Sequence, residues 1–275
     1  MRKFRPENFG SNLSSRLRLR RAAIAERDDA AFGRFLPSGL TLLGLCSGAT
    51  AIPFALSSNW RAAVVAIVIA AIFDTLDGKI ARLLGADSKF GAQLDSLADL
   101  VSFGIAPAVL VYMWSLYKAG GTGWTLVLVF CMCAAVRLAR FNIESGEAGE
   151  EPAAHFTGVP TPAAACLILL PLILSFQFTV ETGFRDPAVS GAVIALVSLA
   201  MVSRLPTPSL KNLHVPRQLR GPLTGFAALL LASAVLWPWA TLSATLIAYV
   251  VMVPVSLLRA AERKRRARDL DDTEL

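Results

Sequence analysis

Long stretches without a charged residue constrain this chain more than any other feature. Gly221 to Leu258 is a run of 38 residues without Asp, Glu, Lys or Arg. Several shorter runs precede it, and a bilayer core of about 30 Å needs about 20 apolar residues of helix. Hydrophobic residues make up 55% of the 275 residues and charged ones 17%, a balance that excludes a soluble globular or disordered chain. We therefore expect an all-α, polytopic membrane helix bundle.

The apolar runs predict eight membrane-spanning helices. The 38-residue run would be about 57 Å long as one helix, so we divide it at Trp237-Pro238-Trp239, which combines a helix breaker with interfacial aromatic residues. The other six predicted spans are Phe35 to Trp60, Ala62 to Leu84, Gly91 to Tyr117, Ala119 to Val136, Phe156 to Val180 and Pro187 to Ser203. The expected organisation is a basic segment over 1–35, a six-span catalytic core over 36–208, a loop over 209–220, two further spans within 221–258 and a charged tail over 259–275.

The Lys and Arg residues predict the orientation. Of the 27, all but Arg61, Lys118 and Arg185 fall on the side of the two termini, which the positive-inside rule assigns to the cytoplasm. The net charge of +7 is then mostly a topology signal, and no nucleic-acid partner is expected. Leu13 to Phe35 is predicted to be a basic amphipathic helix on the cytoplasmic face of the membrane. A disordered basic tail is the alternative.

Four aspartates in the second and third predicted spans are the strongest functional signal. Asp74 and Asp77 share one helix face, and Asp95 and Asp99 share a face of the next helix, after a predicted turn over Leu83 to Phe90. Carboxylates within a span are costly and usually functional. Four that face one another need cations, and oxygen ligands favour Mg²⁺ or Mn²⁺, with Ca²⁺ as an alternative.

The residues around these acids indicate phosphoryl transfer. Gly78 and Gly91 leave room for a substrate beside the helix backbone, and Lys79 and Arg82 add positive charge. Acids, divalent metals and Arg together are typical of phosphoryl-transfer sites. Ordinary helix-end charges and a cation transporter are the alternatives. A transporter predicts acids spread across the bilayer and an internal repeat, and the sequence shows neither.

The acidic segment resembles the signature D-x2-D-G-x2-A-R-x8-G-x3-D-x3-D of the CDP-alcohol phosphotransferase family. Every fixed position is met, by Asp74, Asp77, Gly78, Ala81, Arg82, Gly91, Asp95 and Asp99. The resemblance implies a six-helix core in a homodimer. It also implies a metal site open to the cytoplasm, where a CDP-linked lipid loses CMP to an acceptor alcohol, and a place in the bacterial inner membrane.

Within that family the chain is most similar to the bacterial CDP-diacylglycerol:serine phosphatidyltransferases, from about Leu36 to Pro208. The segments that carry the similarity are LDSLADLVSFGIAP from Leu94, RLARFN from Arg137 and FTGVPTPAA from Phe156. This implies transfer of the phosphatidyl group to serine, a step of phospholipid biosynthesis. Glycerol 3-phosphate, inositol phosphate and choline are the alternative acceptors. Related enzymes often have P-N-x-x-T near the first span, where this chain has Ser38 in place of the Asn.

The resemblance also implies roles for individual residues. Asp74, Asp77 and Asp95 would hold one Mg²⁺ or Mn²⁺ ion, Asp74, Asp95 and Asp99 would hold a second, and Asp99 would be the general base. The residues expected near the CDP-lipid are Thr75, Gly78, Ala81, Arg82 and Gly91.

The acceptor needs a group that recognises its carboxylate. Arg137, Arg140 and Asn142 follow the fourth predicted span at about the depth of the acids, and a guanidinium can bind a carboxylate through two hydrogen bonds. The alternative is that the two arginines only anchor the helix at the interface.

Overall fold

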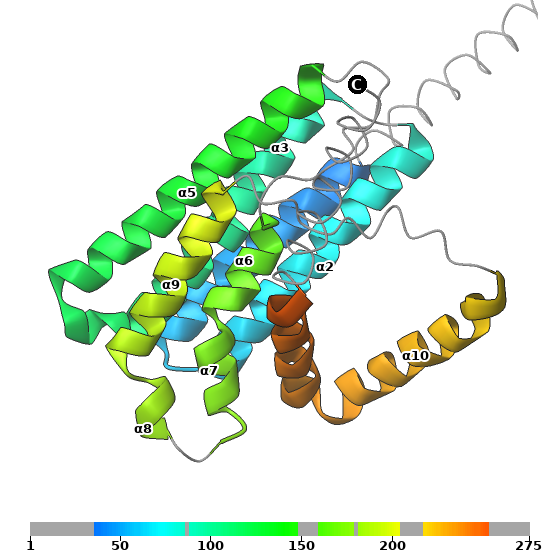
Figure 1. The fold of residues 1–275 in the computed structure, drawn as a ribbon. Coiled ribbons are helices and arrows are strands. Elements are labelled where there is room, and N and C mark those ends of the chain that lie inside the picture. Colours follow the sequence, from blue (N-terminus) through cyan, green and yellow to red (C-terminus); the bar gives the residue numbers. More distant parts are fainter. Residues whose placement is uncertain (1–35, 86–87, 148–158, 179–180, 204–216, 253–275) are drawn as a thin grey trace, which may run out of the picture.

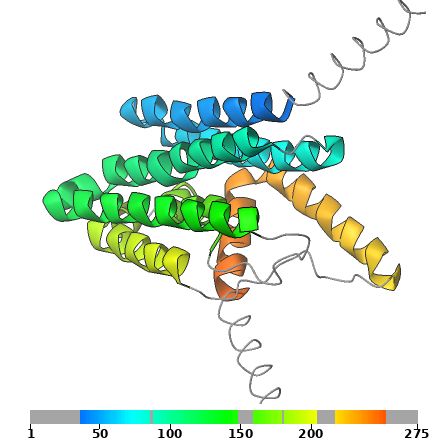
Figure 2. The same cartoon turned by 90° about the horizontal axis from the view of Figure 1, so that it is seen from above.

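The computed structural model describes residues 36–85, 88–147, 159–178, 181–203 and 217–252, and all regular structure within these ranges is helical (Figure 1). The predictions for residues 1–35, for 209–216 and for the tail over 259–275 lie outside the described residues. Most helices pack side by side in one bundle, whereas α10 points away from it (Figures 1 and 2).

The described helices have the following order along the chain. The first described helix is Leu36–Leu56, followed by α2 (Trp60–Leu84). A continuous helix over Lys89–Trp114 consists of α3 (Lys89–Asp99), a π-helical segment (Leu100–Ile105) and α4 (Ala106–Trp114). A 3₁₀ turn (Leu116–Ala119) leads to α5 (Gly121–Glu147), α6 (Thr161–Ile168), α7 (Leu170–Ser175), α8 (Glu181–Phe184), α9 (Pro187–Val202) and α10 (Arg217–Leu236). The last described helix is Pro238–Met252.

The described helices have the length and composition of a membrane protein. Three of them, Leu36–Leu56, Lys89–Trp114 and Gly121–Ile143, are long and apolar enough to cross a membrane. Pro187–Val202, Ala227–Leu236 and Pro238–Met252 are shorter apolar helices. Helix α2, with 25 residues, is also long enough to cross a membrane, but its acidic and basic residues lower its hydropathy. The fold is thus a membrane helix bundle, and the count of eight spans stays a prediction.

Two helices extend further into polar sequence than their apolar runs. Helix α5 continues to Glu147, beyond the expected end at Val136, and α10 begins at Arg217, so the loop predicted over 209–220 is wrong for its last four residues. Hydropathy predicts which residues lie in the lipid, not where the helix ends. The helical hydrogen bonds continue through polar sequence because Arg, Gln and Leu are good helix formers. The fifth predicted span is interrupted at Leu169, because Pro171 has no N–H to donate within the helix.

The turn between α2 and α3 is shorter than expected, and two residues define it. Gly85 follows α2 with φ 57°, and its N–H donates to the carbonyls of Ala81 and Arg82, which is the left-handed cap that favours glycine. Ser88 precedes α3 and accepts a hydrogen bond from the Gly91 N–H at 2.9 Å. The two caps end one acidic helix and start the next within a few residues. The continuous helix that begins with α3 then contacts α2 through its π-helical segment and α4.

Close contacts between small residues hold the first helix against the acidic helices. A side chain at Gly48 would collide with Ser102 of the π-helical segment, and one at Gly44 would lie 3.3 Å from the Phe73 Cβ. The Ser47 hydroxyl donates to the Ala66 carbonyl at 2.8 Å. Within lipid, helices associate mainly through such packing and hydrogen bonds. The first helix therefore covers the acidic helices closely enough to line their site.

The last helix, Pro238–Met252, packs on the bundle (Figure 1). Gln177 donates to the Trp239 carbonyl at 2.9 Å and to the Ser243 hydroxyl at 2.7 Å, and the rings of Phe176 and Trp239 meet edge to face with centroids 4.7 Å apart. Ser243 and Leu246 are buried. The helix break falls at Trp237, where the aromatic-proline sequence predicted it.

Candidate active site

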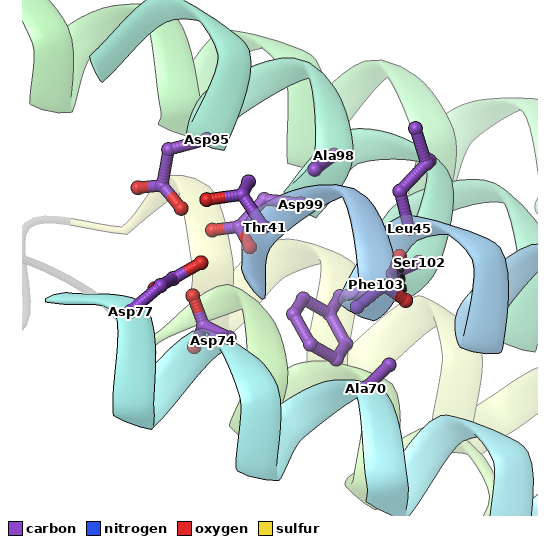
Figure 3. A pocket seen from close by; sticks show the side chains of 11 residues that line it. Thr41, Leu45, Ala70, Asp74, Asp77, Asp95, Ala98, Asp99, Ser102 and Phe103 are labelled. Carbon is purple, nitrogen blue, oxygen red and sulfur yellow. Dashed lines mark hydrogen bonds between the residues drawn. The ribbon is translucent and has the colours of Figure 1, made fainter. Parts of the chain in front are cut away.

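Four carboxylates point toward one another between α2 and α3 (Figure 3). Asp74 and Asp77 come from α2, and Asp95 and Asp99 come from α3. One ligand oxygen each from Asp74, Asp95 and Asp99 lies within 4.8 Å of the other two. Asp77 is the most buried of the four, with 4% of its surface exposed. The structure thus brings together all four acids that the sequence singles out.

The hollow beside these carboxylates has a polar end and an apolar end. Its lining comes from the first helix, α2, α3 and the π-helical segment, namely Thr41, Gly44, Leu45, Ala70, Asp74, Asp77, Asp95, Ala98, Asp99, Ser102 and Phe103. The acids and Thr41 lie together at one end, whereas Phe103 and Ala70 lie toward the other (Figure 3). An apolar wall limits solvent access, which strengthens the interaction between the carboxylates and any bound cation.

The donor set fits a divalent cation. The Asp77 Oδ2 atom is buried and has no hydrogen-bond partner among the described residues. A buried carboxylate oxygen without a partner is costly, and an ion is one of the groups that satisfies such an oxygen. Together with the three clustered carboxylates it offers only oxygen ligands, which suit hard cations such as Mg²⁺, Mn²⁺ and Ca²⁺. The site could therefore hold a metal.

The helix that carries Asp95 and Asp99 changes its winding directly after the second acid. The π-helical segment begins at Leu100 and includes Ser102, whose hydroxyl donates to the Gly44 carbonyl at 3.4 Å. Gly104 in the same segment allows close packing, because a Cβ there would lie 3.2 Å from the Ala134 Cβ of α5. Such π-helical turns occur frequently at functional sites. Here the turn joins the acidic half of the helix to its apolar half.

The residues expected near the CDP-lipid lie on the same two helices. Thr75 and Arg82 are exposed, and they bond to their own helix at the Ala71 carbonyl (2.9 Å) and the Gly78 carbonyl (2.8 Å). A Cβ at Gly78 would meet only the tip of Arg82 at 4.0 Å, whereas one at Gly91 would lie 3.0 Å from the Ser88 hydroxyl. Gly78 thus leaves free space beside the acids, and Gly91 makes room for a helix cap.

The residues expected at the acceptor have three different environments on α5. Arg137 donates from Nη1 to the Thr161 hydroxyl at 2.8 Å. Arg140 is exposed and donates to the Val202 carbonyl at 3.3 Å, where it caps the end of α9. The Asn142 Oδ1 accepts a hydrogen bond from Ser96 of α3 at 2.9 Å. Their contacts lie on three separate elements, α6, α9 and α3.

Four hydroxyl residues near these groups were missed in the sequence analysis. Thr41 and Ser102 line the hollow, whereas Ser96 and Thr161 bond to Asn142 and Arg137. Single Ser and Thr residues in apolar helices carry no pattern of their own. The available signals were that Ser96, Ser102 and Thr161 lie inside the segments that resemble the phosphatidyltransferases, and that Thr41 is the Thr of the P-N-x-x-T pattern near the first span.

A comparison with protein families now adds to this geometry. The family model described as CDP-alcohol phosphatidyltransferase matches residues 34–203. The chain belongs to this family. The match covers the first helix through α9 and includes all four acids, and it identifies the chain as a phosphotransferase rather than a cation transporter. Members of the family depend on divalent cations in general, which agrees with the carboxylate cluster. The last helix and α10 lie beyond the matched residues.

Several relatives are similar over most of the chain. A CDP-diacylglycerol-serine O-phosphatidyltransferase of Mycobacterium bovis is 36% identical over 226 residues, which cover 82% of this chain and 78% of the relative. The protein of the same name from Bacillus subtilis is 34% identical and covers 65% of this chain and 92% of its own. An archaetidylserine synthase of Methanothermobacter thermautotrophicus is 34% identical and covers 63% and 69%.

Proposed function

We propose that this protein transfers the phosphatidyl group of CDP-diacylglycerol to the hydroxyl of L-serine, giving phosphatidylserine and CMP. The choice of serine as the acceptor rests on the names of the relatives. Those from bacteria and from an archaeon all include serine, although the lipid part of the name changes from phosphatidyl to archaetidyl. The observation that carries the chemistry is the cluster of four acids on α2 and α3 within the family-matched residues.

The reaction replaces a phosphoanhydride bond by a phosphoester bond. The serine hydroxyl oxygen forms a bond to the lipid-side phosphorus of CDP-diacylglycerol, and the bond from that phosphorus to the oxygen bridging to CMP breaks. CMP leaves with the bridging oxygen. The hydroxyl proton passes to Asp99, the proposed general base, which needs little basicity because the proton leaves late in a loose transition state.

Two Mg²⁺ or Mn²⁺ ions complete the proposed site. Asp74, Asp77 and Asp95 would hold one ion, and Asp74, Asp95 and Asp99 would hold the other. When bound, such ions neutralise phosphate oxygens and the charge that develops on the leaving group. The orphaned Asp77 oxygen and the spacing of the other three carboxylates support this assignment.

The remaining residues of the two helices would bind the CDP-lipid. Gly78 leaves open space next to the acids, and Thr75, Ala81, Arg82 and Gly91 belong to the same stretch of the signature. The pyrophosphate carries negative charge, so the exposed Arg82 is the residue suited to contact it. Arg137 is the residue best placed to bind the serine carboxylate, because it is half-buried on α5, which contacts α3, the helix of Asp99.

The proposal includes a location and an assembly. The distribution of Lys and Arg supports a place in the bacterial cytoplasmic membrane with both termini and the active site facing the cytoplasm. The resemblance to the family supports a homodimer. Crosslinking in membranes, followed by denaturing electrophoresis, tests the dimer, which would appear as a species of twice the 29.4 kDa chain mass.

The function is tested with the purified full-length protein in mixed micelles. The protein receives CDP-diacylglycerol, Mn²⁺ or Mg²⁺ and one acceptor at a time: L-serine, glycerol 3-phosphate, inositol phosphate or choline. CMP release and the mass of the lipid product are measured together. We expect serine to give the fastest release and phosphatidylserine as the product. Faster release with another acceptor contradicts the assignment of serine while leaving the family assignment intact.

A further inference from the structure

Arg137 is held by a neighbour that the proposed mechanism does not use. Its Nη1 donates to the Thr161 hydroxyl at 2.8 Å, a bond between α5 and α6. Its Nε is buried and has no hydrogen-bond partner among the described residues. One side of the guanidinium is therefore fixed by the protein, and another N–H remains free for an acceptor oxygen. A buried N–H without a partner is costly, so a bound anion at this position gains a strong interaction.

Thr161, which accepts the hydrogen bond from Arg137, lies in a restricted environment. It is fully buried, with 0% of its surface exposed. It is the first residue of α6, and the prolines at positions 160 and 162 flank it, the first with φ −56°. Proline fixes φ, and a β-branched side chain has few allowed χ1 rotamers. The backbone on both sides of Thr161 is thus restricted, and its hydroxyl has few positions available before any substrate binds.

The position of Arg137 relative to the acids suggests why its side chain should be held by Thr161. Arg137 lies on α5, which contacts α3, the helix that carries the proposed base Asp99. An acceptor whose carboxylate binds the guanidinium would therefore lie with its hydroxyl on the side of Asp99. Orientation of this kind converts binding into correct placement of the attacking oxygen. A guanidinium free to rotate would still attract a carboxylate, but it would not place the hydroxyl.

We propose that Thr161 is a positioning residue for the acceptor: its hydroxyl fixes the Arg137 guanidinium in the orientation that binds the carboxylate of the amino acid. This rests on the proposed function, in which Arg137 binds serine. Thr161 itself touches no reacting atom. It acts through Arg137, so its removal should affect the acceptor and leave binding of the CDP-lipid unchanged.

The test replaces Thr161 by Val, which keeps the shape and removes the hydroxyl, and by Ser, which keeps the hydroxyl. Initial rates of CMP release are measured with the full-length protein while serine and CDP-diacylglycerol are varied in turn. We expect Thr161→Val to raise the KM for serine by roughly 10-fold, the value of one hydrogen bond to a charged group at the low end of its range. The KM for CDP-diacylglycerol should stay within about 2-fold of the parent value, within the scatter of such comparisons. Thr161→Ser should recover most of the loss.

The matched control is Ser115→Ala. Ser115 is also fully buried, and its hydroxyl also joins two distant parts of the chain, through the Arg185 carbonyl at 3.1 Å, but none of its hydrogen bonds within the described residues goes to the acids or to Arg137. Ser115→Ala should leave the KM for serine and the KM for CDP-diacylglycerol unchanged. Thermal unfolding of each variant separates a folding defect from a kinetic one, and Thr161→Ala replaces the valine variant if that variant does not fold.

A double-mutant cycle decides whether Thr161 acts through Arg137. In an Arg137→Ala background, Thr161→Val should change the serine KM no further, because the group that it orients is absent. An unchanged serine KM in Thr161→Val, an equal rise in both KM values, or full additivity in the cycle each overturns the inference. If the parent protein forms no phosphatidylserine, the proposed function fails instead, whatever the Thr161 variants do.

Discussion

Replacing Asp95 by Asn should stabilise the metal-free protein and disable the enzyme. The ligand oxygens of Asp74, Asp95 and Asp99 lie within 4.8 Å of one another. At that separation two unit charges repel by about 3.5 kcal/mol at an effective dielectric constant of about 20. Asp95 has two such neighbours, so the repulsion would be on the order of 7 kcal/mol if all three carboxylates were ionised. Because a shared proton relieves most of this repulsion, we expect a net gain of about 1 to 2 kcal/mol in the free energy of unfolding.

The sign of the effect should reverse when metal is added. Asparagine offers a neutral ligand, so Mn²⁺ should stabilise the parent protein and hardly affect Asp95→Asn. Loss of an outer-shell partner already costs 10- to 100-fold, so we expect CMP release to fall by at least about 100-fold. Thermal unfolding is measured in EDTA and in Mn²⁺, and CMP release is measured on the same samples.

Asp186→Asn is the control for this experiment. Asp186 caps α9 by accepting from the Ala188 N–H at 2.8 Å, and asparagine caps equally well. This variant loses one carboxylate outside the acidic cluster and should behave like the parent protein in both media. If Asp95→Asn is less stable than the parent in EDTA and gains as much stability as the parent from Mn²⁺, the carboxylates do not share a metal site and the reasoning is refuted.

Three further predictions test other parts of the account. Asp74→Asn and Asp99→Asn should each lower CMP release by orders of magnitude in a folded protein, and near-normal turnover in either variant would count against the proposed metal and base roles. Gln177→Ala removes two hydrogen bonds to the last helix, so the unfolding temperature should fall by a few degrees. An unchanged unfolding temperature would show that apolar packing alone holds that helix on the bundle. A reporter fused after Leu275 should be cytoplasmic and one at Gly121 should face outward, whereas an external C-terminus would contradict the two spans predicted after α9.

The sequence predicted the bundle because lipid imposes a simple rule on composition. A segment that crosses the membrane must be apolar over a fixed length, and that length is visible in the sequence. Helix ends do not follow this rule. The polar end of α5 to Glu147 and the start of α10 at Arg217 depend on backbone hydrogen bonding in residues that hydropathy does not register. The π-helical turn at Leu100 was also not predictable, since it depends on close packing of the helix at Ser102 and Gly104.

The acids of the site were predictable for a different reason. Spacings of three and four residues place Asp74 with Asp77, and Asp95 with Asp99, whatever the tertiary structure. The support of Arg137 was not predictable, because its bond to Thr161 joins residues 24 positions apart on different helices. The same is true of Ser96 and Asn142, which are 46 positions apart. Spacing within one helix can be read from sequence, whereas contacts between helices depend on how they pack.

The fate of one oxygen atom tests the central claim most directly. The purified protein is given CDP-diacylglycerol, Mn²⁺ and L-serine with oxygen-18 in its hydroxyl group, and both products are analysed by mass spectrometry. Attack by the serine hydroxyl on the lipid-side phosphorus predicts phosphatidylserine that retains the heavy oxygen and CMP that contains none. Heavy oxygen in CMP, or CMP released without formation of phosphatidylserine, would contradict the account.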